Sequence, residues 1–223
     1  MFRYEDIKEL EELFKERKPL NFQGLVDHVG SDMKVNNLSG GDDGYILRRH
    51  KGIREASVLI PIIEREGGYF IILTKRGNHL SDHPGQVSFP GGSREDGDLD
   101  DVETALRETW EEIGISSKFI DVIGSLEPYH TITGFRVTPI VGIVSPDFTL
   151  KVDVNEVAEV FEIPLIHILN KENHEKHSRE LQGQTRRFFA MPYNDHYIWG
   201  ATAAILVNLS YSLLNHIELD RKE

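Results

Sequence analysis

The stretch from Gly85 to Ile115 constrains the fold more than any other part of the chain. It begins with a short apolar segment, passes through a glycine-rich loop and continues into a helical pattern over Asp101–Ile113. Asp100 and Glu103 have the spacing of a capping box, and Gly114 provides a C-terminal stop, so both helix ends can be predicted. A strand end, a glycine-rich loop and a capped helix in such close succession are typical of a compact catalytic module.

Three glutamates of this helix, Glu108, Glu111 and Glu112, share one face, because residues three and four apart are neighbours on a helix. Their carboxylates repel one another, and Arg107 offsets only one of the charges, so a further cation is expected at the cluster. Oxygen ligands on a rigid helix suit Mg²⁺ or Mn²⁺, and the loop upstream can add the carbonyl of Gly91. A solvated acidic face is the alternative, and it is the commoner fate of glutamate runs.

The charge of the chain narrows the classes of partner. Lys plus Arg minus Asp plus Glu is 25 − 37 = −12, which disfavours nucleic-acid binding because phosphate contacts need clustered basic residues. Residues 92–115 carry nine acids against two arginines, a balance of 2 − 9 = −7, so over half of the excess lies around the glutamate cluster. The absence of cysteine excludes a zinc-thiolate site and a cysteine nucleophile. With no targeting signal and no apolar run long enough to span a membrane, we expect a cytoplasmic protein that binds neither nucleic acid nor membrane.

The rest of the chain predicts a layered α/β domain. Residues 1–52 have the pattern of an amphipathic N-terminal helix, stopped by Pro19, and a connecting loop rich in Gly, Asn, Asp and Ser. We place the catalytic domain in residues 53–223. Expected strands cover residues 56–63, 69–74, 119–125, 135–144 and 156–163, and expected helices besides 101–113 cover 165–169 and 199–217. Residues 170–185 are polar, with a hairpin tip expected at residues 182–184.

The segment from Gly92 to Ile115 resembles the Nudix box. The pattern of that box is Gly, five residues, Glu, seven residues, then Arg-Glu-hydrophobic-any-Glu-Glu-any-Gly-hydrophobic. Its second half is matched by Arg107, Glu108, Glu111, Glu112, Gly114 and Ile115. The resemblance implies a Nudix-like α/β/α sandwich with a mixed β-sheet. It also implies a Mg²⁺ or Mn²⁺ cofactor held by Glu108, Glu111, Glu112 and the carbonyl of Gly91.

The first half of the box departs from the pattern. Leu99 stands eight residues before Arg107, where the family has its glutamate, and the segment is one residue longer than the pattern. Thr109 replaces the usual hydrophobic residue. The resemblance implies that the missing glutamate holds the arginine in place, so Asp98 or Asp100 is the candidate to take over that role through the longer loop.

A narrower resemblance extends from about Ile53 to about Leu209 and accounts for the longer box. It is to the coenzyme A pyrophosphatase branch of the Nudix hydrolases, and it departs at Ser81, where the branch usually has arginine. The similar segments are Leu73–Arg76, His79–Leu80, His83–Gly92, Thr104–Thr109, Thr133–Pro139, Glu156–Leu165 and Ile198–Ala203.

The resemblance implies that water attacks one phosphorus of a pyrophosphate that links a nucleoside to another group. The substrate adds negative charge to the glutamate cluster, so divalent ions are needed to reverse the local field. We predict Glu111 or Glu112 as the base and count Arg107 among the catalytic residues. Family members often use a further carboxylate from outside the box, for which Glu156 and Glu159 are candidates, although either could equally be structural.

Substrate contacts are expected at the end of the second strand and in the loop that follows it. A guanidinium such as that of Arg76 can bind a phosphate with two hydrogen bonds, and a surface ion pair is an equal alternative for it. His79 and His83 would share a face only in a helix, which Pro84 disfavours, so substrate contact is preferred over metal binding. The predicted substrate-binding set is Lys75, Arg76, His83 and Phe89.

Three functions remain open from the sequence. The first is hydrolysis of coenzyme A or its derivatives to 3′,5′-ADP and 4′-phosphopantetheine or its acyl form. The second is the same chemistry on ADP-ribose, NADH or a dinucleoside polyphosphate, which the departure at Ser81 keeps open. The third is a catalytically silent domain that binds a nucleotide or a protein, against which the intact glutamate cluster argues. The expected partner is a small nucleotide substrate of the coenzyme A type, and a homodimer is one assembly open to the chain.

Overall fold

The computed structural model describes residues 9–10, 12–15, 52–80, 83–131, 133–181 and 184–220. Its strands are β1 (Arg54–Arg65), β2 (Gly68–Arg76), β3 (Val87–Ser88), β4 (Gly91–Ser93), β5 (Ile120–Ser125), β6 (Tyr129–His130), β7 (Phe135–Val144), β8 (Val157–Pro164), β9 (Glu175–Leu181), β10 (Gln184–Tyr193) and β11 (His196–Trp199). Its helices are α3 (Asp101–Ile113), α4 (Leu165–Leu169) and α5 (Ala201–Asp220), with short 3₁₀ turns at η3 (Ser117–Phe119) and η4 (Lys171–Asn173). No helix among the described residues is long and apolar enough to cross a membrane.

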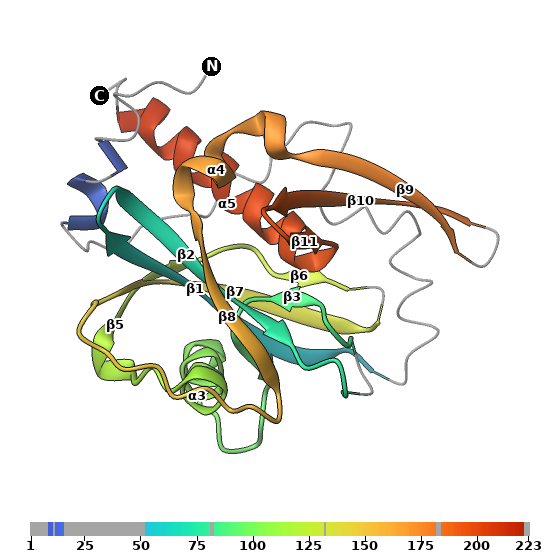
Figure 1. The fold of residues 1–223 in the computed structure, drawn as a ribbon, viewed down its shortest axis with the longest axis horizontal. Coiled ribbons are helices and arrows are strands. Elements are labelled where there is room, and N and C mark those ends of the chain that lie inside the picture. Colours follow the sequence, from blue (N-terminus) through green and yellow to red (C-terminus); the bar gives the residue numbers. More distant parts are fainter. Residues whose placement is uncertain are drawn as a thin grey trace.

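The larger sheet is mixed, with the order β3-β2-β1-β7-β5 (Figure 1). Its centre is the parallel pair β1 and β7, which runs in register from Arg54 opposite Phe135 to Ile63 opposite Val144. β2 returns antiparallel to β1, and β8 adds to the far edge of β2. The continuous apolar runs of β1 and β7 suit strands that are covered on both faces, and all five expected strands are present with ends shifted by at most two residues.

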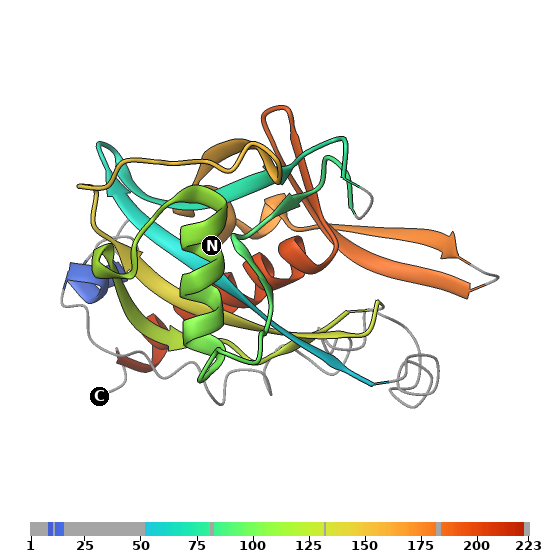
Figure 2. The same cartoon turned by 90° about the horizontal axis from the view of Figure 1, so that it is seen from below.

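Helices cover both faces of this sheet (Figures 1 and 2). On one face α3 packs through Ala105 and Ile113 against Leu59 and other residues of the sheet. On the other face α5 and α4 pack against a larger cluster that includes Ile60. Alternate residues of β1 therefore point to opposite cores, as the two-residue period of a strand requires. The architecture is the expected α/β/α sandwich with a mixed sheet.

The helical residues 9–10 and 12–15 pack on this same domain. Leu10 and Phe14 are 2% and 1% exposed and belong to the core cluster of α5. The ring of Phe14 meets that of Tyr69 edge to face at a centroid distance of 5.0 Å. The apolar stripe expected in this segment thus contacts the larger core, while the expected loop over residues 21–44 lies outside the described residues.

A second sheet has three strands in the order β11-β10-β9. The hairpin tip expected at residues 182–184 falls between the end of β9 and the start of β10, but the extent of these strands and the addition of β11 were not expected. Its strand β9 lies in the polar region 170–185, and its residues from Glu175 to Glu180 are all exposed, so it carries no apolar alternation that would indicate a strand. The last helix begins at Ala201 rather than at residue 199. The reason is that Trp199 ends β11 and Gly200 turns the chain with a φ of 68°.

Candidate active site

The ends of α3 are fixed by the residues that the sequence indicated. Asp100 is the N-cap, and its side chain accepts a hydrogen bond from the backbone N–H of Glu103 at 2.8 Å. The Glu103 carboxylate in turn accepts from the N–H of Leu99 at 2.7 Å. At the other end Gly114 adopts a left-handed conformation with a φ of 76°, and its N–H donates to the carbonyl of Trp110. These caps set the rotation and reach of the helix that carries the glutamates.

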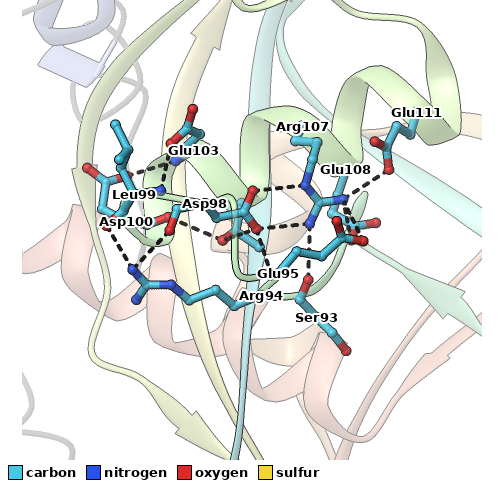
Figure 3. A network of polar contacts seen from close by, with 11 residues as sticks. Ser93, Arg94, Glu95, Asp98, Leu99, Asp100, Glu103, Arg107, Glu108 and Glu111 are labelled. Carbon is cyan, nitrogen blue, oxygen red and sulfur yellow. Dashed lines mark hydrogen bonds and ion pairs between the residues drawn. The ribbon is translucent and has the colours of Figure 1, made fainter.

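Arg107 connects the loop before α3 to the glutamate cluster (Figure 3). Its guanidinium makes two hydrogen bonds to Asp98, at 2.9 and 3.0 Å. Nη1 also donates to Glu108 at 2.9 Å and to Glu111 at 3.0 Å, and Nη2 donates to the carbonyl of Ser93 at 3.1 Å. Arg107 therefore forms hydrogen bonds to several carboxylates, although its single positive charge balances only one negative charge.

Asp98, and not Asp100, is the carboxylate that holds Arg107 in place. The carboxylate is 4% exposed and also accepts from the N–H of Glu95 and the hydroxyl of Thr104, both at 2.9 Å. The Arg107 guanidinium and these donors hold the pKa of Asp98 well below its usual range, and the pKa of Arg107 lies above its own. Asp100 is occupied as the helix cap, and Leu99 is 84% exposed.

Thr104 and Ser93 also support this anchor, although no motif in the sequence marks either of them as functional. Thr104 lies three residues before Arg107, so the two side chains share a face of α3. A hydroxyl at that spacing could have indicated a partner for the anchoring carboxylate. The carbonyl of Ser93 has no sequence signal, because any residue supplies one.

Glu112 is the most deeply buried of the three clustered glutamates, with 4% of the residue exposed. Its carboxylate accepts a long hydrogen bond of 3.4 Å from the N–H of Gly91. Burial raises the pKa of Glu112 to about 8, and the charges of Glu108 and Glu156 act in the same direction, while the Gly91 N–H and Arg76 oppose them. Burial also raises the pKa of Glu108. A carboxyl that gives up its proton near neutral pH suits a general base.

The backbone of Gly92 passes close to Glu108. A Cβ atom added at Gly92 would lie 2.5 Å from the carboxylate of Glu108, which is the mobile end of a flexible side chain. Gly91 is more confined, because its φ is 153° and an added Cβ would meet the backbone of β1 at Ser57 and Val58. The two glycines thus allow β4 to lie against both the sheet and the glutamate cluster.

Replacing Gly92 by Ala is expected to lower kcat by about ten- to hundredfold while the melting temperature changes little, because the added methyl group displaces the Glu108 carboxylate rather than the backbone. Steady-state kinetics and thermal melting check this result. Gly97→Ala is the matched control, since nothing lies within 4 Å of a Cβ at Gly97 and both readouts should be unchanged. A Gly92→Ala enzyme with wild-type kcat would show that the position of Glu108 is unimportant.

The loop before β8 brings Glu156 to the same place. The N–H of Asp153 donates to the carbonyl of Glu112 at 2.9 Å, which joins the loop to the end of α3. The N–H of Gly77 donates to the carbonyl of Glu156 at 2.9 Å, which joins it to the end of β2. The ring of His79 reinforces this junction by bonding to the carbonyl of Asn155 at 2.8 Å.

The two carboxylates proposed from outside the box are separated by the structure. Glu156 lies near enough to Glu108 and Glu112 to raise the pKa of both. Glu159 instead bonds to the ring of His196 at 3.2 Å, in the smaller sheet. Of the two candidates, only Glu156 is placed to act with the glutamates of α3.

The predicted substrate-binding residues are also divided. Arg76 is close enough to Glu112 to influence its pKa, whereas Lys75 is opposite Glu159, and the pairing of β2 with β8 shifts register between Lys75 and Arg76. His83 is exposed and its Nδ1 lies 3.0 Å from the side-chain oxygen of Gln86. Phe89 is 2% exposed in the core cluster of α5, so we assign it to packing rather than to substrate contact. Ser81 lies outside the described residues.

The donor chemistry of the cluster suits a hard divalent cation. All candidate side-chain ligands are carboxylates, whose oxygen atoms are the ligands that such cations prefer. Within the described ranges no group of three or more Asp, Glu or His side chains is already arranged to hold a metal ion. In Figure 3 Glu108 and Glu111 both contact Arg107.

Comparisons with known proteins identify the family of this chain. A family model described as the NUDIX domain matches residues 53–182. Proteins named "Uncharacterized Nudix hydrolase NudL" from Enterobacter sp. (strain 638) and Escherichia coli (strain K12) are each 39% identical to this chain, over 72% of its length and 83% of theirs. A solved structure of the MutT protein from Methanosarcina mazei Go1 is 17% identical over 78% of this chain and 99% of that one, with a TM-score of 0.45. The family match over more than half of the chain and the two relatives show that this protein belongs to the Nudix hydrolase family.

Proposed function

We propose that this Nudix hydrolase cleaves the pyrophosphate bond of coenzyme A or its derivatives, giving 3′,5′-ADP and 4′-phosphopantetheine or its acyl form. One observation supports the proposal: the segments that resemble the coenzyme A pyrophosphatase branch contact one another in the structure. The N–H of Arg76 bonds to the carbonyl of Gln86, Gly77 bonds to Glu156, and Gly91 bonds to Glu112. Segments that lie far apart in the sequence thus surround the buried carboxyl of Glu112.

Members of this family generally use a divalent metal such as Mg²⁺ or Mn²⁺. Glu108, Glu111 and Glu112 would hold it here, with the carbonyl of Gly91 as a further ligand. When bound, such an ion supplies positive charge that offsets the pyrophosphate and lowers the pKa of bound water.

The chain's own carboxylates then supply the proton chemistry. The water oxygen forms a bond to one phosphorus, the bond from that phosphorus to the bridging oxygen breaks, and the proton of the water passes to a carboxylate. Glu112 is the base we assign, because it is the most buried of the three glutamates and the N–H of Gly91 contacts its carboxylate. Glu111 is the alternative, although its side chain is 55% exposed and directed toward Arg107. Arg107 fixes Glu108 and Glu111 relative to the loop at Asp98.

A hydrolysis panel with Mg²⁺ and with Mn²⁺ tests the substrate. It compares coenzyme A and acetyl-coenzyme A with dephospho-coenzyme A, NADH, ADP-ribose and a dinucleoside polyphosphate. We expect the highest kcat/KM for the coenzyme A compounds that carry the 3′-phosphate. Equal values with and without that phosphate, or a higher value for ADP-ribose or NADH, would contradict the assignment while leaving the Nudix chemistry intact.

Arg76 is the residue we propose for contact with the 3′-phosphate. Arg76→Ala is therefore expected to raise KM for coenzyme A by about tenfold or more, because a charge-assisted hydrogen bond is lost. KM for dephospho-coenzyme A should change much less. Lys75→Ala is the matched control, because Lys75 is opposite Glu159, which bonds to His196 in the smaller sheet, and its loss should affect neither KM. If both KM values rise alike in Arg76→Ala, Arg76 acts through Glu112 and does not contact the 3′-phosphate.

A further inference from the structure

The hairpin of β9 and β10 extends away from the body of the protein as a long arm (Figures 1 and 2). β11 pairs with β10 only from Ala190 to Tyr193, so the outer part of the arm has two strands. In that outer part Ser178, Arg179 and Glu180 of β9 are all exposed. Two-stranded ribbons without a packed face are marginally stable in water, so this arm would gain stability from a third strand.

The outer edge of β9 carries no paired strand among the residues that the structure describes. Within the described part of the chain β9 pairs only with β10, which leaves it at the end of the smaller sheet. It contains neither proline nor glycine and shows no register shift against β10. Charged side chains normally discourage pairing at such an edge, so the sign of each charge and its position in the strand decide which partner the edge can accept.

We propose that two copies of this chain pair through their β9 strands, antiparallel about a two-fold axis at Ser178. In this register Lys176 of one copy is opposite Glu180 of the other, and the symmetry repeats the pair. Opposite charges directly across an antiparallel ladder stabilise it. The same surface serves both copies, which is the geometry of a two-fold dimer. The two small sheets become one continuous six-stranded sheet with the order β11-β10-β9-β9-β10-β11.

The remaining residues of β9 are compatible with this register. His177 of one copy is opposite Arg179 of the other, and the His177 ring lies 2.7 Å from the carboxylate of Glu175, which provides a negative charge on the same face. Opposite residues of an antiparallel ladder must both direct their backbone groups toward the partner or both away from it, so the axis can shift only by whole residues. An axis at Arg179 would place that arginine opposite its own copy, which is destabilising. An axis at His177 would also form two opposite-charge pairs, between Glu175 and Arg179, but the axis at Ser178 is central in β9 and pairs the whole strand from Glu175 to Leu181.

Charge reversal tests the proposal on the full-length protein by sedimentation equilibrium. We expect the wild type to dimerise at micromolar concentrations. Lys176→Glu and Glu180→Lys should each raise the dimer dissociation constant about tenfold or more, because each replaces two attractive pairs by two repulsive ones. Neither residue belongs to the active site, so each variant should keep wild-type kcat, which shows that it is folded.

An equimolar mixture of the two variants provides the decisive control. In the mixed dimer both glutamates of one chain are opposite both lysines of the other, so we expect dimerisation to return to the wild-type level. A monomeric wild type, single variants that dimerise as the wild type does, or a mixture that stays dissociated would each overturn the proposal. These outcomes are independent of the substrate, so they separate this inference from the proposed function.

Discussion

Replacing Glu112 by Gln is expected to lower kcat by about a thousandfold with little change in KM, because the amide has the shape of the carboxyl group but cannot accept the proton of the attacking water. Steady-state kinetics with Mg²⁺ and with Mn²⁺ measure the effect. Glu111→Gln is the control, and we expect a smaller loss from it because that side chain is 55% exposed. A larger loss from Glu111→Gln than from Glu112→Gln would make Glu111 the base.

The same substitution has a second readout in stability, measured without divalent ions. The pKa of Glu112 is about 8 in the folded protein against an ordinary value of 4.5. The folded wild type therefore binds one more proton than the unfolded chain between these values, so its free energy of unfolding falls as pH rises from 4.5 to 8. Glu112→Gln has no such group, and its stability should not follow this trend.

The magnitude of this difference can be bounded. At about 1.4 kcal/mol for each pH unit, the change from 4.5 to about 8 sets an upper limit of about 5 kcal/mol. We expect Glu112→Gln to be more stable than the wild type by about 2 to 4 kcal/mol at pH 9 and similar to it at pH 5. Urea denaturation at several pH values measures it. Parallel pH profiles for the two proteins would show that Glu112 ionises normally in the fold.

Local signals in the sequence were sufficient to predict α3. The capping box of Asp100 and Glu103 and the stop at Gly114 involve residues within one turn of the helix ends, so no tertiary contact is needed to define them. The buried strands of the large sheet were predicted for a similar reason, because their apolar runs directly reflect burial. The fold class and the helix that carries the glutamates therefore followed from the chain alone.

The choice between neighbouring candidates depended on tertiary structure instead. Asp98 and Asp100 are two positions apart, and the loop conformation decides which one reaches Arg107. Glu156 and Glu159 are likewise close in sequence, yet one lies near the α3 glutamates and the other bonds to His196. Phe89 could not be assigned because an aromatic residue in a motif looks the same whether it packs in a core or contacts a ligand.

The exposed hairpin shows a different limit of sequence analysis. The residues of β9 from Glu175 to Glu180 are all exposed, so the apolar periodicity that marks most strands is missing there. The sequence indicated a hairpin tip at residues 182–184, which falls between β9 and β10, but not how far the two strands extend. The strand is held by backbone hydrogen bonds to β10, which leave no trace in side-chain pattern.

Asp98→Asn is expected to weaken both the fold and the site, because it removes the charge from a carboxyl that holds Arg107 with two hydrogen bonds. The two guanidinium hydrogen bonds go to the two carboxylate oxygens of Asp98. In asparagine one of these oxygens becomes an NH₂ group, which donates and cannot accept, so both bonds cannot be kept. We expect the free energy of unfolding to fall by about 3 kcal/mol, since one partner of a largely buried ion pair is lost. We expect kcat to fall by up to about a hundredfold, since Glu108 and Glu111 lose the arginine position that orients them.

Asp100→Asn is the matched control for this prediction, because Asn caps a helix about as well as Asp does and stability should stay within about 0.5 kcal/mol of the wild type. Acid provides a further test. The pKa of Asp98 lies below its ordinary value of 3.8, so its contribution to stability is present above that value and is lost as pH falls toward the lower, folded pKa. The wild type and Asp98→Asn should therefore differ fully at pH 7 and converge in strong acid, as followed by urea denaturation. Equal losses in Asp98→Asn and Asp100→Asn at pH 7 would instead mean that the whole loop, and not the Asp98 carboxylate, positions Arg107.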